Sequence, residues 1–312
     1  MSAETTMTTE PAVAQSNSSL AKAGAWARRA PLLPALIFMI IVTQIPFLAT
    51  LVISFMNWNA YYPNNRGFAG FDNFKTVLTD VDARQAIIVT ILLTVGVVVV
   101  SLVLGLAIAL LLDRKFRGRG VARTLMITPF LIVPVAAALL WKHALYNAQY
   151  GLLNGLLRWV FGDSAPQPDW ISDHPLISII VALVWQWTPF MMLILLAGLQ
   201  SRPMDVVEAA KIDGASGWQI FTNMTLPHLR QYIELSGLLG AIYIVQNFDA
   251  VFTITSGGLG TANLPYYIYE TFYSAHDYGT ASAAGVIVVI GSIIIATFAL
   301  RTVLSLFREG TR

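Results

Sequence analysis

The chain alternates between long apolar runs and shorter polar connections. A helix needs about 20 mostly apolar residues to cross the hydrocarbon core of a bilayer. Six runs reach roughly that length, at residues 32–56, 86–112, 124–145, 176–199, 233–255 and 279–300. The third and fourth runs contain prolines, whose freed carbonyls neighbouring helices can satisfy in a membrane. The pattern predicts an all-α integral membrane protein with six transmembrane helices.

Composition agrees with this prediction. Of the 312 residues, 56% are hydrophobic and only 12% are charged, whereas soluble proteins carry about 25% charged residues. That composition excludes a soluble enzyme with a polar surface, and it excludes disorder for most of the chain. The absence of cysteine excludes disulfides, cysteine-ligated zinc and iron–sulfur clusters. A formal net charge of +2 argues against a nucleic-acid partner.

Residues 1–30 differ from the rest because they are rich in Ser, Thr and Ala. We expect a flexible cytoplasmic tail there, followed by a transmembrane domain over residues 31–312. A cleaved signal peptide is disfavoured, since the apolar run after Arg29 is too long and no small-x-small site closes it.

The cationic residues predict the orientation in the membrane. Fourteen of the 19 Lys and Arg residues fall in the tail, in the loop after the second run, in segment 199–232 or at the C-terminal end. Loops rich in Lys and Arg stay in the cytoplasm. We therefore expect both termini inside. The outer loops 57–85 and 256–278 are aromatic, which indicates an interfacial belt or, less simply, a docking or sugar-stacking surface.

The fifth run carries a polar stripe. Ser236, Gly240, Tyr243 and Asn247 are spaced by four, three and four residues and so share one helix face. Polar groups inside a membrane face a bundle interior or a wet cavity. Hydrogen bonding between helices is the alternative, but it needs only one or two such groups, so a full stripe with two small residues favours a pathway. In the fourth run, residues 185–188 (Trp-Gln-Trp-Thr) precede Pro189 and suit either packing beside a kink or the wall of a solute site. The candidate path residues are Tyr243, Asn247, Gln246, Asp249 and Trp187.

Segment 200–231 is moderately polar and contains no apolar run long enough to span a membrane. It nevertheless carries residues typical of helix starts and turns. Pro203 suits a helix start, and Asp213-Gly214 suits a turn. Ser216 and Gln219 have the spacing of a capping box. We expect a helix from Pro203 to about Lys211, a turn, a second short helix, and a break at Leu226-Pro227.

The same segment carries the string Glu208-Ala-Ala-Lys-Ile-Asp-Gly-Ala215, then Phe221 and Leu226-Pro227. This string resembles the EAA motif of permease subunits in bacterial ABC importers. Shorter matches at 34–55, 70–74, 248–258 and 269–283 favour the carbohydrate branch of maltose, glycerol-phosphate and trehalose type, in its compact six-helix form. The resemblance implies the type I importer permease fold. It assigns ATPase coupling to Glu208, Ala209, Ala210, Asp213, Gly214 and Ala215.

The resemblance also implies a function and a set of partners. It describes a non-enzymatic subunit forming half of a sugar path, with a second similar permease, two ATPase subunits and an extracytoplasmic sugar-binding protein. The chain has no P-loop string, so ATP and Mg would bind to partner subunits. No metal motif occurs, because the four histidines are scattered. The alternative is an ion-coupled secondary transporter, but no charge lies deep in any span.

Overall fold

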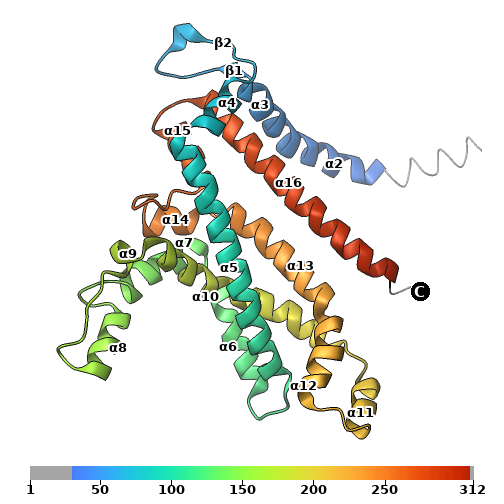
Figure 1. Ribbon diagram of the computed structural model, residues 1–312. Coiled ribbons are helices and arrows are strands. Elements are labelled where there is room, and N and C mark those ends of the chain that lie inside the picture. Colours follow the sequence, from blue (N-terminus) through green and yellow to red (C-terminus); the bar gives the residue numbers. More distant parts are fainter. Residues whose placement is uncertain (1–29, 310–312) are drawn as a thin grey trace, which may run out of the picture. The chain divides into compact units, whose positions relative to one another are not determined.

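The computed structural model describes the backbone of residues 30–309 and the side chains of residues 31–294 and 297. The predicted tail therefore lies almost wholly outside the described residues. The chain divides into two compact units, one ending at Val52 and one beginning at Ile53. Figure 1 labels the helices and strands of both.

The first unit is built from a single apolar helix. It consists of a short 3₁₀ turn η1 (Ala30–Leu32), α2 (Leu33–Met39), a π-helical turn η2 (Ile40–Gln44) and α3 (Ile45–Ser54), whose last two residues belong to the second unit. The 22-residue stretch Leu33–Ser54 is long and apolar enough to cross a membrane. Its apolar residues leave no polar face, which is the pattern of a membrane span. The first predicted run is confirmed as a helix.

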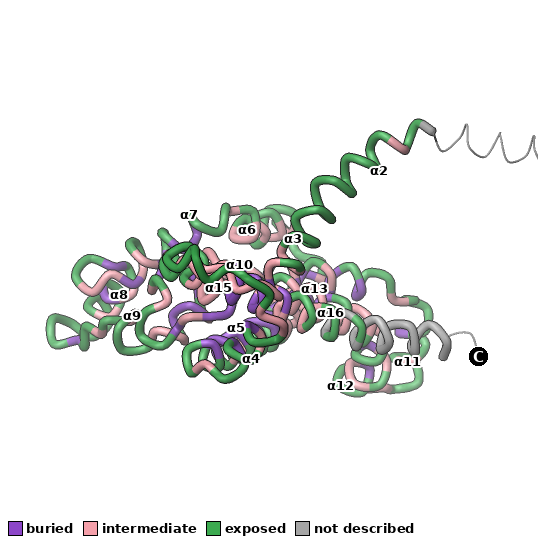
Figure 2. Tube along the Cα trace, turned by 90° about the horizontal axis from the view of Figure 1, so that it is seen from above, coloured by how far each residue is buried: buried purple, intermediate pink, exposed green. Residues whose placement is uncertain are grey.

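The second unit is organised around two long helices, α5 (Val81–Asp113) and α10 (Pro175–Gln200). They pack along each other, and Figure 2 shows buried positions gathered along them. Close approach requires a small residue, because a Cβ on Gly105 would lie 3.0 Å from the backbone nitrogen of Met192. Helix α13 (Leu226–Val245) packs beside this pair, and α16 (Tyr278–Glu309) packs against α13. The helices of the second, fourth and sixth predicted runs thus form.

The third predicted run is a broken helix. Helix α6 (Arg119–Leu131) is followed by α7 (Pro134–Leu139) and a π-helical turn η4 (Leu140–Leu145), with a bend of 96° between the two halves. A residue before proline avoids the helical region, and Ile132 and Val133 are accordingly extended. The freed carbonyl of Ile132 accepts a hydrogen bond from Gln186 Nε2 at 3.2 Å. This confirms the expected repair by a neighbouring helix.

The fifth predicted run is also interrupted, contrary to expectation. Helix α13 ends at Val245, and α14 (Asp249–Ile254) begins after a break at Gln246–Phe248. Asn263 fixes the break, because its buried side-chain amide donates to the backbone carbonyl of Asn247 at 2.6 Å. Hydropathy alone could not reveal this break, because both halves are apolar. Among the described residues, three helices are individually long and apolar enough to span a membrane, and a fourth is if the bent pair is one span.

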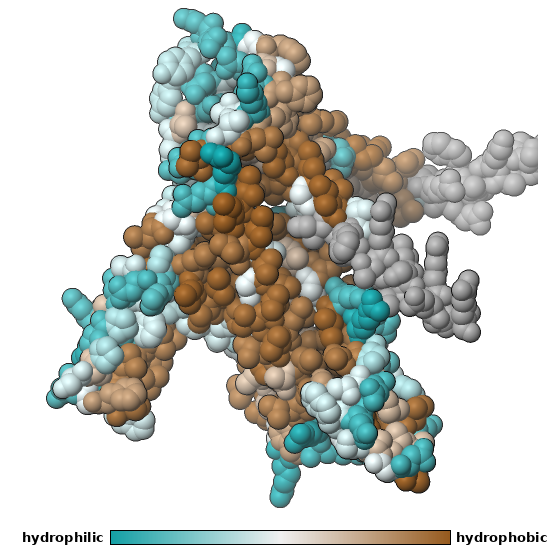
Figure 3. Space-filling view, in the orientation of Figure 1, coloured by the Kyte–Doolittle hydropathy of each residue, from teal (hydrophilic) through white to brown (hydrophobic). Residues whose placement is uncertain are grey.

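Short elements connect the long ones. A two-stranded antiparallel ribbon pairs β1 (Met56–Asn57) with β2 (Gly67–Phe68), a small exception to the all-α prediction. The remaining short connecting helices are η3 (Pro63–Asn65), α4 (Asp72–Thr79), α8 (Leu152–Phe161), α9 (Trp170–Asp173) and α15 (Leu264–Tyr273). Figure 3 shows hydrophobic side chains over the long helices, and hydrophilic ones gathered over the β1–β2 ribbon and over the hairpin of α11 (Met204–Ile212) and α12 (Gly217–Ile220).

Candidate functional site

The hairpin predicted over residues 200–231 is present. Helix α11 (Met204–Ile212) and helix α12 (Gly217–Ile220) are joined by a turn. Pro203 is the N-cap of α11, one residue before the helix proper. The capping box is confirmed: the Gln219 amide donates to Ser216 Oγ at 3.3 Å, and the Ser216 amide donates to Gln219 Oε1 at 2.8 Å. Each helix of the hairpin therefore begins where the sequence predicts.

The turn links the two halves of the motif by backbone bonds. The Ala215 amide donates to the Ala210 carbonyl at 2.9 Å, and the Gly214 amide donates to the Lys211 carbonyl at 3.1 Å. This bond pattern is the Schellman motif, which needs a left-handed residue. Gly214 supplies it with φ +85°. The alanines of the two motif halves are thus parts of one rigid turn.

The predicted break at Leu226-Pro227 is wrong. A π-helical turn η5 (Phe221–Thr225) joins α12 to α13 without leaving helical geometry. Pro227 lies in the first turn of α13, where its missing N–H is not needed. The second arm of the hairpin is therefore continuous with a long helix of the membrane domain.

The exposed surface of the hairpin combines the motif with large apolar side chains. Glu208, Ala209, Asp213 and Gly214 are exposed, and Ala210 and Ala215 are half-buried. Two further residues were not singled out by sequence reasoning: Ile212 is 86% exposed and Trp218 is 71% exposed. Exposed apolar side chains on a charged element indicate a contact surface.

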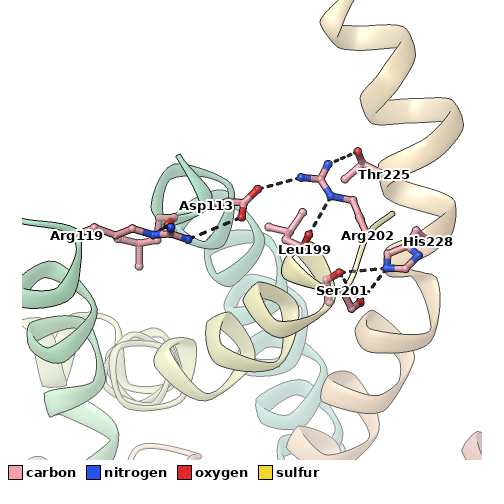
Figure 4. A network of polar contacts seen from close by, with 9 residues as sticks. Asp113, Arg119, Leu199, Ser201, Arg202, Thr225 and His228 are labelled. Carbon is pink, nitrogen blue, oxygen red and sulfur yellow. Dashed lines mark hydrogen bonds and ion pairs between the residues drawn. The ribbon is translucent and has the colours of Figure 1, made fainter. Parts of the chain in front are cut away.

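The base of the hairpin is held by one arginine. Arg202 donates to Asp113 Oδ2 at 2.9 Å, to Thr225 Oγ1 at 2.8 Å and to the Leu199 carbonyl at 3.0 Å (Figure 4). We call these four residues the root network. They come from the ends of α5 and α10, from the start of the hairpin and from η5. The sequence alone indicates Arg202 only as one of the cationic residues on the predicted cytoplasmic side.

A second polar group lies beside the root network. Ser201 Oγ lies 3.1 Å from His228 Nε2 (Figure 4). It also lies 2.8 Å from the Tyr232 hydroxyl and donates to the Gly198 carbonyl at 2.9 Å. Arg119 adds a weaker charge contact, with Nη2 at 3.9 Å from Asp113 Oδ1. Charged hydrogen bonds are shorter and stronger than neutral ones. The root network therefore contributes more to holding the base of the hairpin than the contacts of Ser201 do.

The candidate path residues divide into two groups. Trp187 and Tyr243 come together, with ring centroids 5.3 Å apart and planes inclined by 32°. Phe130 and Phe190 complete an aromatic cluster, lying 5.6 and 5.7 Å from the Trp187 centroid. Tyr243 is 57% exposed, so one side of the cluster is open in this chain. The cluster joins α6, α10 and α13, and the sequence did not point to Phe130.

The lower half of the predicted stripe faces other helices. The Ser236 hydroxyl is buried and donates to the Tyr232 carbonyl of its own helix at 2.7 Å. Gly240 packs against Met191 and Val98, and a Cβ there would displace the flexible end of the Met191 side chain. These two residues are covered by neighbouring side chains or bonded within their own helix, so they form neither a bond between helices nor an open part of a pathway.

The remaining candidates lie at the break in the fifth run. Gln246 is exposed. Asn247 Oδ1 accepts from the Ala250 amide at 3.4 Å. Asp249 is the first residue of α14, where a negative charge is favoured by the free amides of the helix start. This polar break stands at the end of α13 that carries Tyr243.

The aromatic residues of segment 256–278 stack on one another and on α14. Tyr266 and Tyr269 lie within 6.4 Å of the rings of Phe248 and Phe252. A polar cavity of about 700 Å³ lies nearby, between the start of α5 and α15. Burial, with a further contribution from the charge of Asp80, raises the pKa of Tyr267 in its wall to about 12.

Comparison with known proteins identifies the family to which the chain is similar. Residues 101–305, more than half of the chain, match the family described as binding-protein-dependent transport system inner membrane component. A probable ABC transporter permease protein, y4oQ, of Sinorhizobium fredii is 37% identical over 262 residues, covering 83% of this chain and 84% of the relative. The trehalose transport system permease protein SugA of Mycobacterium tuberculosis is 34% identical, covering 82% and 81%.

A trehalose/maltose transport system permease protein, MalF, of Thermococcus litoralis is 32% identical, covering 82% of this chain and 86% of the relative. Among solved structures, a bacterial ABC transporter that imports the acidic polysaccharide alginate matches with a TM-score of 0.77 over 90% of this chain and 96% of that chain, at 23% identity. That likeness confirms the type I importer permease fold. None of these matches supports an ion-coupled secondary transporter. By the family match and these relatives, the chain belongs to the family of inner-membrane permease components of binding-protein-dependent ABC transport systems.

Proposed function

We propose that this chain is one of two permease subunits of a sugar importer, and that its hairpin receives the movement of an ATPase subunit. The relatives named for trehalose and maltose transport support a sugar as the substrate class. The expected partners are a second permease, two ATPase subunits holding ATP and Mg, and an extracytoplasmic sugar-binding protein. ATP hydrolysis belongs to the ATPase subunits, since this chain carries no P-loop string.

One observation carries the coupling role: the hairpin is exposed at its tip and rigidly held at its base. At the tip, Ile212 and Trp218 offer apolar area beside the acidic Glu208. Buried aromatic and aliphatic anchors supply most of the binding energy of protein interfaces. At the base, Arg202 ties the hairpin to α5 and α10. A push on the tip is therefore delivered to the helices that form the core of the membrane domain.

The aromatic cluster is proposed as one wall of the sugar path. Tyr243 and Trp187 present ring faces on which a sugar ring can stack, and Asn247, Gln246 and Asp249 supply hydrogen-bonding groups beyond them. A site built on hydrogen bonds loses about 1–3 kcal/mol when one partner is left unpaired. Asn247→Leu should therefore reduce sugar uptake while the subunits still assemble.

The proposed orientation has the hairpin and both termini in the cytoplasm. A cysteine scan tests it without background, because the chain has no cysteine. A Gln219→Cys variant should be silent to an impermeant thiol reagent on intact cells and should react once the membrane is opened. A Tyr62→Cys variant, in the predicted outer loop 57–85, should react on intact cells. Labelling of Gln219→Cys on intact cells contradicts the orientation.

The complex itself provides the main test. We expect the tagged chain to copurify with an ATPase subunit and a second permease, and sugar-loaded binding protein to stimulate ATP hydrolysis. Glu208→Lys should release the ATPase or abolish the stimulation. Asp163→Lys, which reverses an exposed charge in the loop between α8 and α9, is the matched control and should leave both properties unchanged. Wild-type behaviour of Glu208→Lys would move the coupling contact elsewhere.

A further inference from the structure

The connection between α5 and α6 is strongly cationic. Helix α5 ends at Asp113 and α6 begins at Arg119, so residues 114–118 join them. Segment 113–123 holds five Lys and Arg residues and a single acidic residue, which leaves a formal net charge of +4. Figure 3 shows hydrophilic side chains at the lower ends of these two helices, next to their hydrophobic surface.

Two of the five cations have partners within the chain. Arg119 Nε donates to the Leu112 carbonyl at 2.6 Å, and its Nη2 lies 3.9 Å from Asp113 Oδ1. With its amide oriented to pair, the Gln200 side-chain oxygen accepts from both Arg119 and Arg123. The root network already engages Asp113. The one acidic residue of the segment is therefore not available to the other three cations.

Those three cations, Arg114, Lys115 and Arg117, are exposed. Within the part of the chain that the structure describes, none of their side chains makes a hydrogen bond or an ion pair. Three like charges within four residues repel one another. A ligand of this loop must therefore be negatively charged, and phosphate oxygens suit both guanidinium and ammonium groups.

The place of the loop along α5 points to a phosphate that belongs to a lipid. Residues 86–112 carry no charge, and as a helix they are about 40 Å long, enough to cross a hydrocarbon core of about 30 Å. Loop 114–118 therefore begins at the polar layer of the bilayer. Large apolar side chains surround the loop, since Leu111, Phe116 and Leu125 are 59%, 46% and 64% exposed. A soluble anion would leave them in water, whereas a phospholipid offers phosphate and hydrocarbon together.

We propose that loop 114–118 binds the headgroup of an anionic membrane phospholipid, with its phosphate held by Arg114, Lys115 and Arg117. Long cationic side chains lay their stems on apolar surface while the charge reaches the headgroup, and Phe116 occupies the interfacial layer that aromatic rings favour. In the proposed orientation this is the cytoplasmic leaflet. Because the loop follows Asp113 directly, the bound lipid holds the end of α5 beside the root network.

Photo-crosslinking in the assembled transporter tests the proposal. The whole complex is placed in nanodiscs of phosphatidylcholine that contain a small fraction of phosphatidylglycerol with a photoreactive group on its headgroup. After irradiation, mass spectrometry of peptides should locate the label within residues 111–121. Unlabelled phosphatidylglycerol should compete for this labelling. Inorganic phosphate should not compete, because it lacks the hydrocarbon that the apolar side chains around the loop require.

Paired substitutions measure the contribution of the cations. Each cation near an anionic bilayer contributes about fivefold in affinity, so Lys115→Gln combined with Arg117→Gln should lower the labelling about 25-fold. Lys115→Arg combined with Arg117→Lys keeps both charges and should restore most of the labelling. Lys75→Gln combined with Arg84→Gln is the matched control, because it removes two exposed cations near the other end of α5. This control should label the loop as the wild type does. Size-exclusion chromatography confirms that each variant remains assembled.

Two outcomes overturn the proposal. Equal labelling of the wild type and of the Lys115→Gln, Arg117→Gln variant would show that the cations of the loop do not hold the lipid. Absence of label from the wild-type loop, with carbodiimide crosslinks from Lys115 to a carboxylate of an ATPase subunit in its place, would show that an acidic protein surface covers it. Neither outcome affects the proposed sugar import, which is measured separately through uptake and ATP hydrolysis.

Discussion

The base of the hairpin and the aromatic cluster are held together by different kinds of contact. At the base, Arg202 makes three directed hydrogen bonds of 2.8–3.0 Å to three separate segments. In the cluster, Trp187 and Tyr243 touch through ring faces, 5.3 Å between centroids, across two helices. Directed charged bonds fix an orientation, whereas ring contacts tolerate several geometries. The chain is thus held rigidly at the base of the hairpin, where we propose that the ATPase acts, and is adaptable in the cluster that we propose as a wall of the sugar path.

The largest effect is expected from removing the arginine of the root network. Arg202→Met removes the hydrogen bonds to Asp113 and Thr225 and leaves Asp113 only its 3.9 Å contact with Arg119. A lost hydrogen bond to a charged group costs about 1.5–3 kcal/mol. Sugar uptake per ATP hydrolysed, measured in proteoliposomes, should fall at least tenfold. Arg202→Lys retains the charge but not the three-way geometry, so it should give an intermediate value.

Arg230→Met is the matched control for this prediction. Arg230 pairs with Glu234 on the same helix, and its side chain is 59% exposed. Exposed pairs of this spacing contribute about 0.3–0.5 kcal/mol. If Arg202→Met and Arg230→Met reduce coupling to the same extent, the distinction between a rigid base and an ordinary surface pair fails.

The next effect concerns the turn of the hairpin. Gly214 has φ +85°, and nothing lies within 4 Å of the position of a Cβ, so only backbone strain opposes a side chain there. A left-handed conformation costs a Cβ-bearing residue about 1–2 kcal/mol. Gly214→Val should therefore misdirect α12 and lower both ATPase retention and sugar-stimulated hydrolysis. Gly217→Val has the same open space without the positive φ and should retain both.

A smaller effect is expected in the aromatic cluster. Tyr243→Ala removes a ring contact with Trp187 that is worth about 0.5–1.5 kcal/mol. The KM for sugar uptake should rise a few-fold, while ATPase retention stays at the wild-type level. Tyr243→Phe keeps the ring and isolates the contribution of the hydroxyl. Unchanged uptake by both variants would remove Tyr243 from the path.

The smallest effect belongs to the buried part of the polar stripe. Ser236 bonds to a carbonyl of its own helix, so Ser236→Ala should change stability and uptake by about 0.5 kcal/mol or less. Asn247→Leu, in the break after α13, should have the larger effect on uptake. If Ser236→Ala reduces uptake as much as Asn247→Leu does, the buried part of the polar stripe also belongs to the sugar path.

The sequence predicts features that depend on neighbours along the chain. The capping box at Ser216 and the turn at Asp213-Gly214 are local, and both are present. The bend after Leu131 and the break at Gln246 depend on partners far along the chain. Gln186 supports the first and Asn263 the second. The root network is missed for the same reason, because Asp113 and Arg202 are 89 residues apart. Periodicity also cannot say which side of the polar stripe meets another helix.

The Schellman turn restricts how this hairpin can vary during evolution. The bond from the Ala215 amide to the Ala210 carbonyl requires a fixed number of residues between them. One inserted residue would turn the following helix by about 100°, since a helix has 3.6 residues per turn. The tip would then present a different face to its partner. The geometry of the turn therefore accepts substitutions at its exposed positions but not a change in the number of residues.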